Sequence, residues 1–269
     1  MPLEFLDPLT HVHAMLVAGA ESASVFITRP APGVTIGDVG GQIASVPIHG
    51  AIVTLRADGL VAVLREDTSD APPCVRPSEY RLEPTLTERG GCYVAHIQGG
   101  ILPGAVYDIA ITLPDGTSVH GTTTVPRVPI ITAPEAGSEF DATSRDETLT
   151  ITWVSARSEY AEVEIQANDD CRISTQPISL TVHDDGGSVR VRRWPGWFCH
   201  GTGVHDTELL LSLYDSSYAA FRRELARSDN AIRLSRSSFG LTGAIGIFSS
   251  TSMATLPVRV RWSRQPTGE

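Results

Sequence analysis

The sequence predicts an all-β protein of two tandem β-sandwich domains, with one short helix inserted in the second. Three observations support this fold class. Apolar and polar residues alternate along many short segments, which is the period of a half-buried strand. Turn dipeptides such as Asp58-Gly59 and Asp115-Gly116 separate these segments. The chain has 269 residues and a proline-bearing break near its middle, which fits two domains.

The first domain is predicted over residues 8–126. Its clearest element is the hairpin around Asp115-Gly116, where Tyr107, Ile109 and Ile111 share one face. Short strands separated by such turns favour an immunoglobulin-like sandwich. The strands are expected at Thr10–Leu16, Ser22–Arg29, Ala51–Ala57, Leu60–Glu66, Gly91–Gln98, Ala105–Leu113 and Thr117–Val125.

A linker at 127–129, held extended by the prolines at its borders, leads to a second domain at 130–264. Its first strands carry Trp153 on an inward face and then alternate charged with apolar residues, a pattern that resembles fibronectin type III-like sandwiches. Further strands are expected at Ile178–Val182, Ser188–Trp194, Glu208–Tyr214, Phe239–Phe248 and Leu256–Trp262.

One amphipathic helix is predicted over about 216–227. Tyr218, Phe221 and Leu225 fall at i, i+3 and i+7, so they share a face. Asp215 precedes this segment, where its carboxylate can accept hydrogen bonds from the first helical turn. The sequence therefore predicts a helix whose apolar face packs on the second sandwich.

Three glycines follow the helix as Gly240, Gly243 and Gly246. The dinucleotide-binding pattern has a different spacing and opens a helix after a strand. The glycines are therefore interpreted as close-packing or bulge positions within a strand.

Composition excludes several classes of function. The net charge of −10 opposes nonspecific binding to nucleic acid or to an anionic membrane. The chain contains no lysine, which excludes a Schiff base and a P-loop lysine. No apolar run approaches the roughly 18–20 residues of a membrane span, so no transmembrane segment is expected.

The four cysteines fall two in each predicted domain, which fits one disulfide per domain. The expected pairs are Cys74–Cys92, which would pin the long polar loop at 67–89, and Cys171–Cys199. Four buried thiols in a cytosolic protein are the alternative. The N-terminus has no signal-peptide pattern, so the chain is either cytosolic or a mature form. The paired cysteines favour an exported protein.

The segments HVHAMLVAGAESASVFITRP, GAIVTLRADG and GCYVAHIQGG resemble bacterial envelope lipoproteins with an N-terminal immunoglobulin-like module, close to the carboxypeptidase-regulatory-like type. The segments DSSYAAFRRELA and SSFGLTGAIGIFSSTS resemble the lipoproteins of unknown function often encoded beside TonB-dependent receptors. The resemblance implies no catalytic residue and no cofactor. It implies a periplasmic or outer-envelope location, with membrane association through a partner or a removed lipid anchor.

A basic and aromatic patch is the candidate interface, because arginine and tryptophan are enriched at interface hot spots. Its residues, with two helix arginines, are Arg190, Arg192, Trp194, Trp197, Arg222 and Arg223. These observations predict a non-catalytic binding or scaffolding protein, an accessory subunit whose partner is a protein of a bacterial envelope or membrane complex. The alternative is capture of a glycan or small molecule for a transporter, with a tryptophan stacked on a sugar ring.

A metal-dependent enzyme is the remaining alternative. His200, His205 and Asp206 are weak candidate ligands that would have to converge on one ion. No HExxH, EF-hand or G-x-S-x-G pattern is present, so no catalytic residue is assigned.

Overall fold

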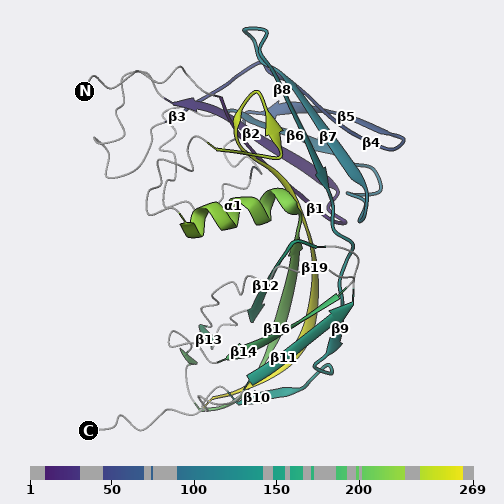
Figure 1. The fold of residues 1–269 in the computed structure, drawn as a ribbon, viewed down its shortest axis with the longest axis vertical. Helices are drawn as coiled ribbons and strands as arrows, with labels where there is room; N and C mark the ends of the chain where they lie inside the picture. Colours follow the sequence, from purple (N-terminus) through teal and green to yellow (C-terminus); the bar gives the residue numbers. More distant parts are fainter. Residues whose placement is uncertain are drawn as a thin grey trace, which may run out of the picture. The chain divides into compact units, whose positions relative to one another are not determined.

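The structure is a computed structural model that describes residues 10–30, 45–69, 74, 90–141, 148–154, 158–165, 171–172, 186–192, 198–199, 202–227 and 237–262 (Figure 1). The described residues are mostly β-strand with one short helix, as predicted. They form two compact units. Unit 1 comprises residues 1–125 and 215–251, and unit 2 comprises residues 126–214 and 252–269.

These units differ from the predicted domains in two respects. The break after Val125 lies before the predicted linker at 127–129, and residues 215–251, with the helix and the glycine-rich segment, belong to unit 1 rather than to the second sandwich. Residue alternation shows which side chains of a strand are buried. It does not show which distant strand is its neighbour, and here residues 245–251 pair with the first strand of the chain.

Unit 1 is built from eleven described elements and the first part of β19 (Ile245–Trp262). The elements are β1 (His11–Val17), β2 (Ser22–Pro30), β3 (Ser45–Pro47), β4 (Ile52–Ala57), β5 (Leu60–Asp67), β6 (Cys92–His96), β7 (Val106–Thr112), β8 (Ser118–Thr124), α1 (Ser216–Arg227), β17 (Ser238–Phe239) and β18 (Leu241–Thr242). The predicted hairpins β4–β5 and β7–β8 are confirmed.

Strand pairing in unit 1 closes on itself. The order β19-β1-β2-β6-β5-β4-β7-β8-β18 runs through antiparallel pairs, apart from the parallel pair β1–β19. β17 and β18 are separated by Gly240 alone, and β17 pairs with β19, so the circuit returns to the strand where it began. The inward faces bury one hydrophobic cluster that includes Tyr93, Ile109 and Phe248.

The glycine-rich segment closes this circuit. Gly240, Gly243 and Gly246 have φ values of 69°, 85° and 109°, where side chains other than glycine are strained. A Cβ at each would also collide with a backbone carbonyl oxygen of a neighbouring strand or turn. The close-packing part of the prediction is therefore confirmed, but only Gly246 lies within a strand, because Gly240 and Gly243 are in the short connections before β18 and β19. The predicted strands Phe239–Phe248 and Leu256–Trp262 are instead the short β17 and β18 and the 18-residue β19.

The predicted helix is confirmed as α1 (Ser216–Arg227), with Tyr218 and Phe221 buried. Asp215 is its N-cap, because its Oδ1 accepts the N–H of Tyr218 at 3.0 Å. The Thr123 hydroxyl donates to Asp215 Oδ2 at 2.6 Å, which joins the helix to β8. Burial raises the pKa of Asp215, although its hydrogen bonds act in the opposite direction.

Unit 2 consists of described strands that surround a second hydrophobic cluster, which includes Phe140, Trp153 and Leu211. β16 lies between β12 and the second part of β19, β11 lies between β14 and β9, and β13 pairs with β15. The strands are β9 (Ile130–Ala133), β10 (Glu139–Asp141), β11 (Thr148–Val154), β12 (Tyr160–Ile165), β13 (Cys171–Arg172), β14 (Gly186–Arg192), β15 (Phe198–Cys199) and β16 (Gly203–Tyr214). The predicted strand Ile178–Val182 lies outside the described residues.

Within the described parts of the chain, no helix has the length and hydropathy needed to cross a bilayer.

Candidate functional site

An open hollow in unit 1 lies where β4 ends and β7 begins. Its volume is about 630 Å³. The turn after β4 lines one side and the loop before β7 lines the other. The side chains that give the hollow its chemistry are Arg56, Asp58, Leu102, Pro103, Val106 and Asp108.

Backbone hydrogen bonds hold the loop before β7 in place. The N–H of Leu102 donates to the Tyr107 hydroxyl at 2.8 Å, and the N–H of Gly104 donates to the Val125 carbonyl at 2.8 Å. Val125 donates back to the Ala105 carbonyl at 2.9 Å. Because these bonds come from the backbone and from a buried tyrosine, the hollow is formed before any ligand arrives.

The hollow combines a cation, carboxylates and apolar surface. Arg56 and Asp108 are register partners on β4 and β7, so their side chains lie on the same face. Asp108 accepts a hydrogen bond from the Thr122 hydroxyl at 2.6 Å, whereas Arg56 forms no ion pair with any described residue. Leu102 and Val106 remain 51% and 49% exposed. The lining therefore offers apolar surface together with charges of both signs, one cation and two carboxylates.

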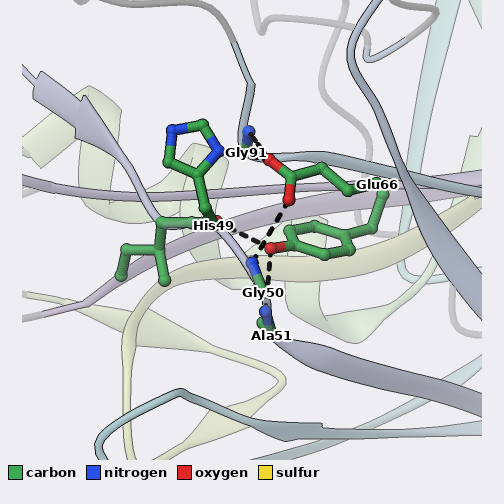
Figure 2. Close-up of polar contacts among 7 residues, drawn as sticks. His49, Gly50, Ala51, Glu66 and Gly91 are labelled. Atoms are coloured by element: carbon green, nitrogen blue, oxygen red, sulfur yellow. Dashed lines mark hydrogen bonds and ion pairs between the residues drawn. The ribbon is translucent and has the colours of Figure 1, made fainter.

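At the other end of the β4–β5 hairpin, polar groups gather around the carboxylate of Glu66 (Figure 2). Its Oε1 accepts Gly91 N–H at 3.1 Å and its Oε2 accepts Gly50 N–H at 3.2 Å. Nδ1 of His49 lies 2.6 Å from Oε1. We call this group, with Tyr93, the Glu66 clamp. It ties the segment before β4 to β5 and to the segment before β6.

The clamp favours the charged form of Glu66. Burial on its own would raise the pKa of Glu66, but the hydrogen bonds from Gly91, Gly50 and His49 outweigh it and hold the pKa below its ordinary value. If Nδ1 of His49 carries the proton, Nε2 of this half-exposed ring is left as an acceptor. A carboxylate that orients a histidine occurs in catalytic and metal sites. In the described residues, however, no group of three metal-ligating side chains accompanies the pair.

Tyr93 and two glycines complete the clamp. The Tyr93 hydroxyl donates to the Ile48 carbonyl at 2.7 Å and accepts the N–H of Ala51 at 3.0 Å, and burial raises its pKa. Gly90 and Gly91 have φ values of 117° and 74°. A Cβ at Gly90 would collide with the His49 ring, and one at Gly91 would collide with a backbone carbonyl. The clamp is therefore a structural device that fixes the base of the hairpin.

The residues of the predicted interface are spread over both units. Arg190 is exposed on β14 of unit 2, and Arg192 ends that strand opposite Thr148. Trp194 and Trp197 lie outside the described residues. In unit 1, the half-buried Arg222 lies over the Tyr218 ring at 6.0 Å, and Arg223 is exposed on α1.

Two of the three candidate metal ligands lie in the described residues, and the structure does not bring them together. His205 and Asp206 are consecutive residues of β16, so their side chains leave opposite faces of the strand. His200 lies outside the described residues. This placement gives no support to a shared ion.

The predicted disulfide Cys74–Cys92 is present, with an S–S distance of 2.10 Å. It fixes Cys74 to the start of β6. Cys171 and Cys199 are register partners in the β13–β15 pair, a position compatible with a cross-strand disulfide. The side chains of these two residues lie outside the described set, and their bond stays a prediction.

Sequence reasoning missed both the hollow and the clamp. The signals were present but weak: a tight turn at Asp58-Gly59 and a glycine pair at Gly90-Gly91. Neither pattern indicates which distant segment will lie beside it.

No protein-family model and no curated protein matches the chain. Among solved structures, the chain is similar to a chimeric titin Z1Z2-Z1Z2 tandem functionalized with a GRGDS exogenous peptide from fibronectin. The identity is 11%, the match covers 97% of this chain and 98% of that chain, and the TM-score is 0.20. A TM-score this low carries no argument about arrangement or function.

Proposed function

We propose that this protein works by binding, as a non-catalytic accessory or scaffolding subunit at a bacterial envelope or membrane-protein complex. The observation that carries the proposal is the hollow, where Leu102 and Val106 stay half exposed beside the cation of Arg56. Exposed apolar side chains around a preformed hollow are typical of a surface that accepts an anchor residue of another protein.

The charges around the hollow support a protein partner. Arg56 is exposed in a chain whose net charge is −10 and forms no ion pair within the described residues, although the carboxylates of Asp58 and Asp108 line the same hollow. An anionic group of a partner would gain an ion pair with Arg56, while an adjoining apolar group would cover Leu102 and Val106. We expect the polar residues Asp58 and Asp108 to form the rim of such an interface.

The envelope location rests on the Cys74–Cys92 disulfide, which persists in oxidising compartments, and on the resemblance to envelope lipoproteins. We also propose that unit 1 is a variant of the immunoglobulin-like sandwich and that unit 2 is a variant of the fibronectin type III-like sandwich. The predicted membrane association, through the partner or a removed lipid anchor, belongs to the same proposal.

Co-purification from the native envelope in mild detergent tests the proposal. We expect the protein to be recovered in a complex with an envelope protein. The double variant Leu102→Asp and Val106→Asp should lose that partner. The control Val128→Asp, which changes a 45% exposed residue of unit 2, should keep it. Recovery of the wild-type protein only as a free species would count against the proposal.

Ligand capture is the second candidate, because the volume of about 630 Å³ is that of a small-molecule site. In this alternative, an anionic ligand or glycan feeds a transporter and contacts Arg56. Thermal-shift and calorimetric screening of acidic sugars and small acids tests it. A hit that Arg56→Ala abolishes, without an envelope protein in the purified complex, would favour ligand capture over a protein partner.

A further inference from the structure

β5 has two halves with different surroundings. Within the described residues, β6 pairs with β5 only from Arg65 to Asp67. The first half, Leu60–Leu64, pairs with β4 on one side and has no described strand on the other. Among the described residues this half of the strand is therefore an edge, and the β4–β5 hairpin that carries it can be followed in Figure 1.

Hairpin geometry shows which backbone groups this edge presents. Ala57 and Leu60 flank a two-residue turn and are register partners, so they form the hydrogen-bonded type of pair. Hydrogen-bonded and non-hydrogen-bonded pairs then alternate along the hairpin, so the N–H and C=O groups of Ala62 also point toward β4. Consequently, the N–H and C=O groups of Val61 and Val63 point away from β4, toward the open edge.

The side chains of the edge are apolar and unusually exposed. Val61 and Val63 are 68% and 60% exposed on the outward face, and the segment Leu60–Leu64 has no charge and no proline. Proteins usually protect an edge strand with a charge, a proline, a bulge or a covering segment, because an uncharged edge adds further strands. Within the part of the chain that the structure describes, the edge has no such protection, and its backbone groups are available to pair with a further strand.

The sequence of the edge identifies the strand that fits it. Leu60-Val61-Ala62-Val63-Leu64 reads the same in both directions. Any sequence that pairs antiparallel with its own copy obeys two-fold symmetry, but the palindrome also places valine opposite valine and leucine opposite leucine, cross-strand pairs that pack well on one face of a sheet. We propose that the protein forms a homodimer by antiparallel pairing of β5 with β5 of a second copy, with Ala62 on the two-fold axis.

The register follows from this symmetry. Val61 lies opposite the partner's Val63, and Val63 lies opposite the partner's Val61. These are the residues whose N–H and C=O groups face outward, so each of the two pairs forms two backbone hydrogen bonds. Arg65, which forms no ion pair with any described residue, lies opposite the partner's Gly59 and beside the partner's Asp58.

The dimer goes beyond the proposed function, because it presents two copies of the hollow at once. Two linked binding sites raise the avidity for a repeated or oligomeric partner without any new contact. The dimer rests on the edge strand and not on the hollow. A failure of either proposal would leave the other standing.

Sedimentation of the purified full chain over a range of concentrations provides the first test. We expect a species of twice the 28.8 kDa monomer mass to appear as concentration rises. Val61→Lys places a charge on the edge and should weaken self-association by about tenfold or more. Ile130→Lys changes a 64% exposed residue of unit 2 and should have no effect. A wild-type chain that stays monomeric at every concentration, or a Val61→Lys chain that dimerises as well as wild type, would overturn the proposal.

Cysteine pairing under mild oxidation tests the register. Val61→Cys and Val63→Cys lie opposite one another only across the proposed axis, with Cα atoms about 5.5 Å apart, within disulfide range. A mixture of the two variants should form a cross-linked heterodimer, and either variant alone should cross-link far less. Equal cross-linking in all three samples, or none in any, would contradict this register. If an added extended peptide of unrelated sequence pairs with the edge while the chain itself does not, the homodimer is wrong.

Discussion

The two ends of the β4–β5 hairpin are built on opposite principles. At the base, the Glu66 carboxylate has three hydrogen-bond partners, and Tyr93 donates one hydrogen bond and accepts another. At the turn, Arg56 has no described ion pair, and the valines of β5 project into solvent. Both ends belong to the same two strands of unit 1. The difference arises from what each end contacts: at the base, backbone groups of the segments before β4 and β6 pair with Glu66 and Tyr93, whereas at the turn the exposed side chains have no such partners within the described residues.

This contrast separates stability from recognition. Paired polar groups, here the partly exposed Glu66 carboxylate and the buried Tyr93, fix a hairpin in one position. Unpaired apolar and cationic groups at the far end gain little within the chain, and they are free to meet a partner. Variants at the base should therefore lower stability, and variants at the turn should alter binding or self-association while stability is retained.

The largest effect is expected from Gly91→Ala. The backbone of Gly91 has a φ of 74°, and a Cβ would collide with the carbonyl oxygen of Ile27. Strain and collision together should lower the free energy of unfolding by about 3 kcal/mol or more, measured by urea denaturation. Gly99→Ala is the matched control, because its φ is 82° but no atom lies near the added Cβ. Equal losses for both variants would show that the close contact at Gly91 is unimportant.

Glu66→Ala should have the next largest effect. The N–H groups of Gly50 and Gly91 lose their acceptor, and because both bonds are at least partly open to solvent, the free energy of unfolding should fall by about 1 kcal/mol. Arg65→Ala, a change at the adjacent exposed residue, should stay within about 0.5 kcal/mol of wild type. Chemical denaturation of both variants measures the difference. A Glu66→Ala protein as stable as the Arg65→Ala protein would show that the Glu66 clamp does not stabilise the fold.

The stability contributed by the Glu66 clamp should depend on pH, with a smaller effect whose direction follows from the pKa of Glu66. The folded-state pKa of Glu66 is below its ordinary value of 4.5, so its contribution to stability is present above that value. The contribution is lost as pH falls through the folded-state pKa. The stability difference between wild type and Glu66→Gln should therefore be constant from neutral pH to about pH 5 and should narrow below about 4.5. A difference that widens in acid would reverse the sign and contradict the prediction.

The smallest effect on stability is expected at the hollow. Arg56→Ala removes an exposed side chain without a described ionic partner, so the unfolding free energy should change by no more than about 0.5 kcal/mol. The same variant should weaken binding of an anionic partner or ligand. Thermal denaturation and a binding assay on one sample measure both quantities. A large loss of stability with unchanged binding would place Arg56 in the structural part of the hairpin.

The sequence predicted local features better than long-range ones. The Asp58-Gly59 hairpin, the helix at 216–227 and the Cys74–Cys92 bridge all follow from patterns that lie close together in the chain or from a simple pairing rule. The parallel pairing of β19 with β1 joins segments more than 200 residues apart, and alternation contains no information about such neighbours. For the same reason, neither Glu66 with Gly50 and Gly91, nor Arg56 with Leu102, could be assembled from the sequence.

Site-specific photo-cross-linking in cells tests directly whether the hollow binds an envelope protein. A photoreactive residue replaces Leu102 at the hollow, and the control replaces Ile130, which is exposed on unit 2. If the hollow binds the partner, the Leu102 position should give a discrete adduct with an envelope protein, with a mass distinct from that of a homodimer, and Ile130 should give no such adduct. The absence of an adduct at Leu102, or the same adduct from both positions, would contradict recognition through the hollow.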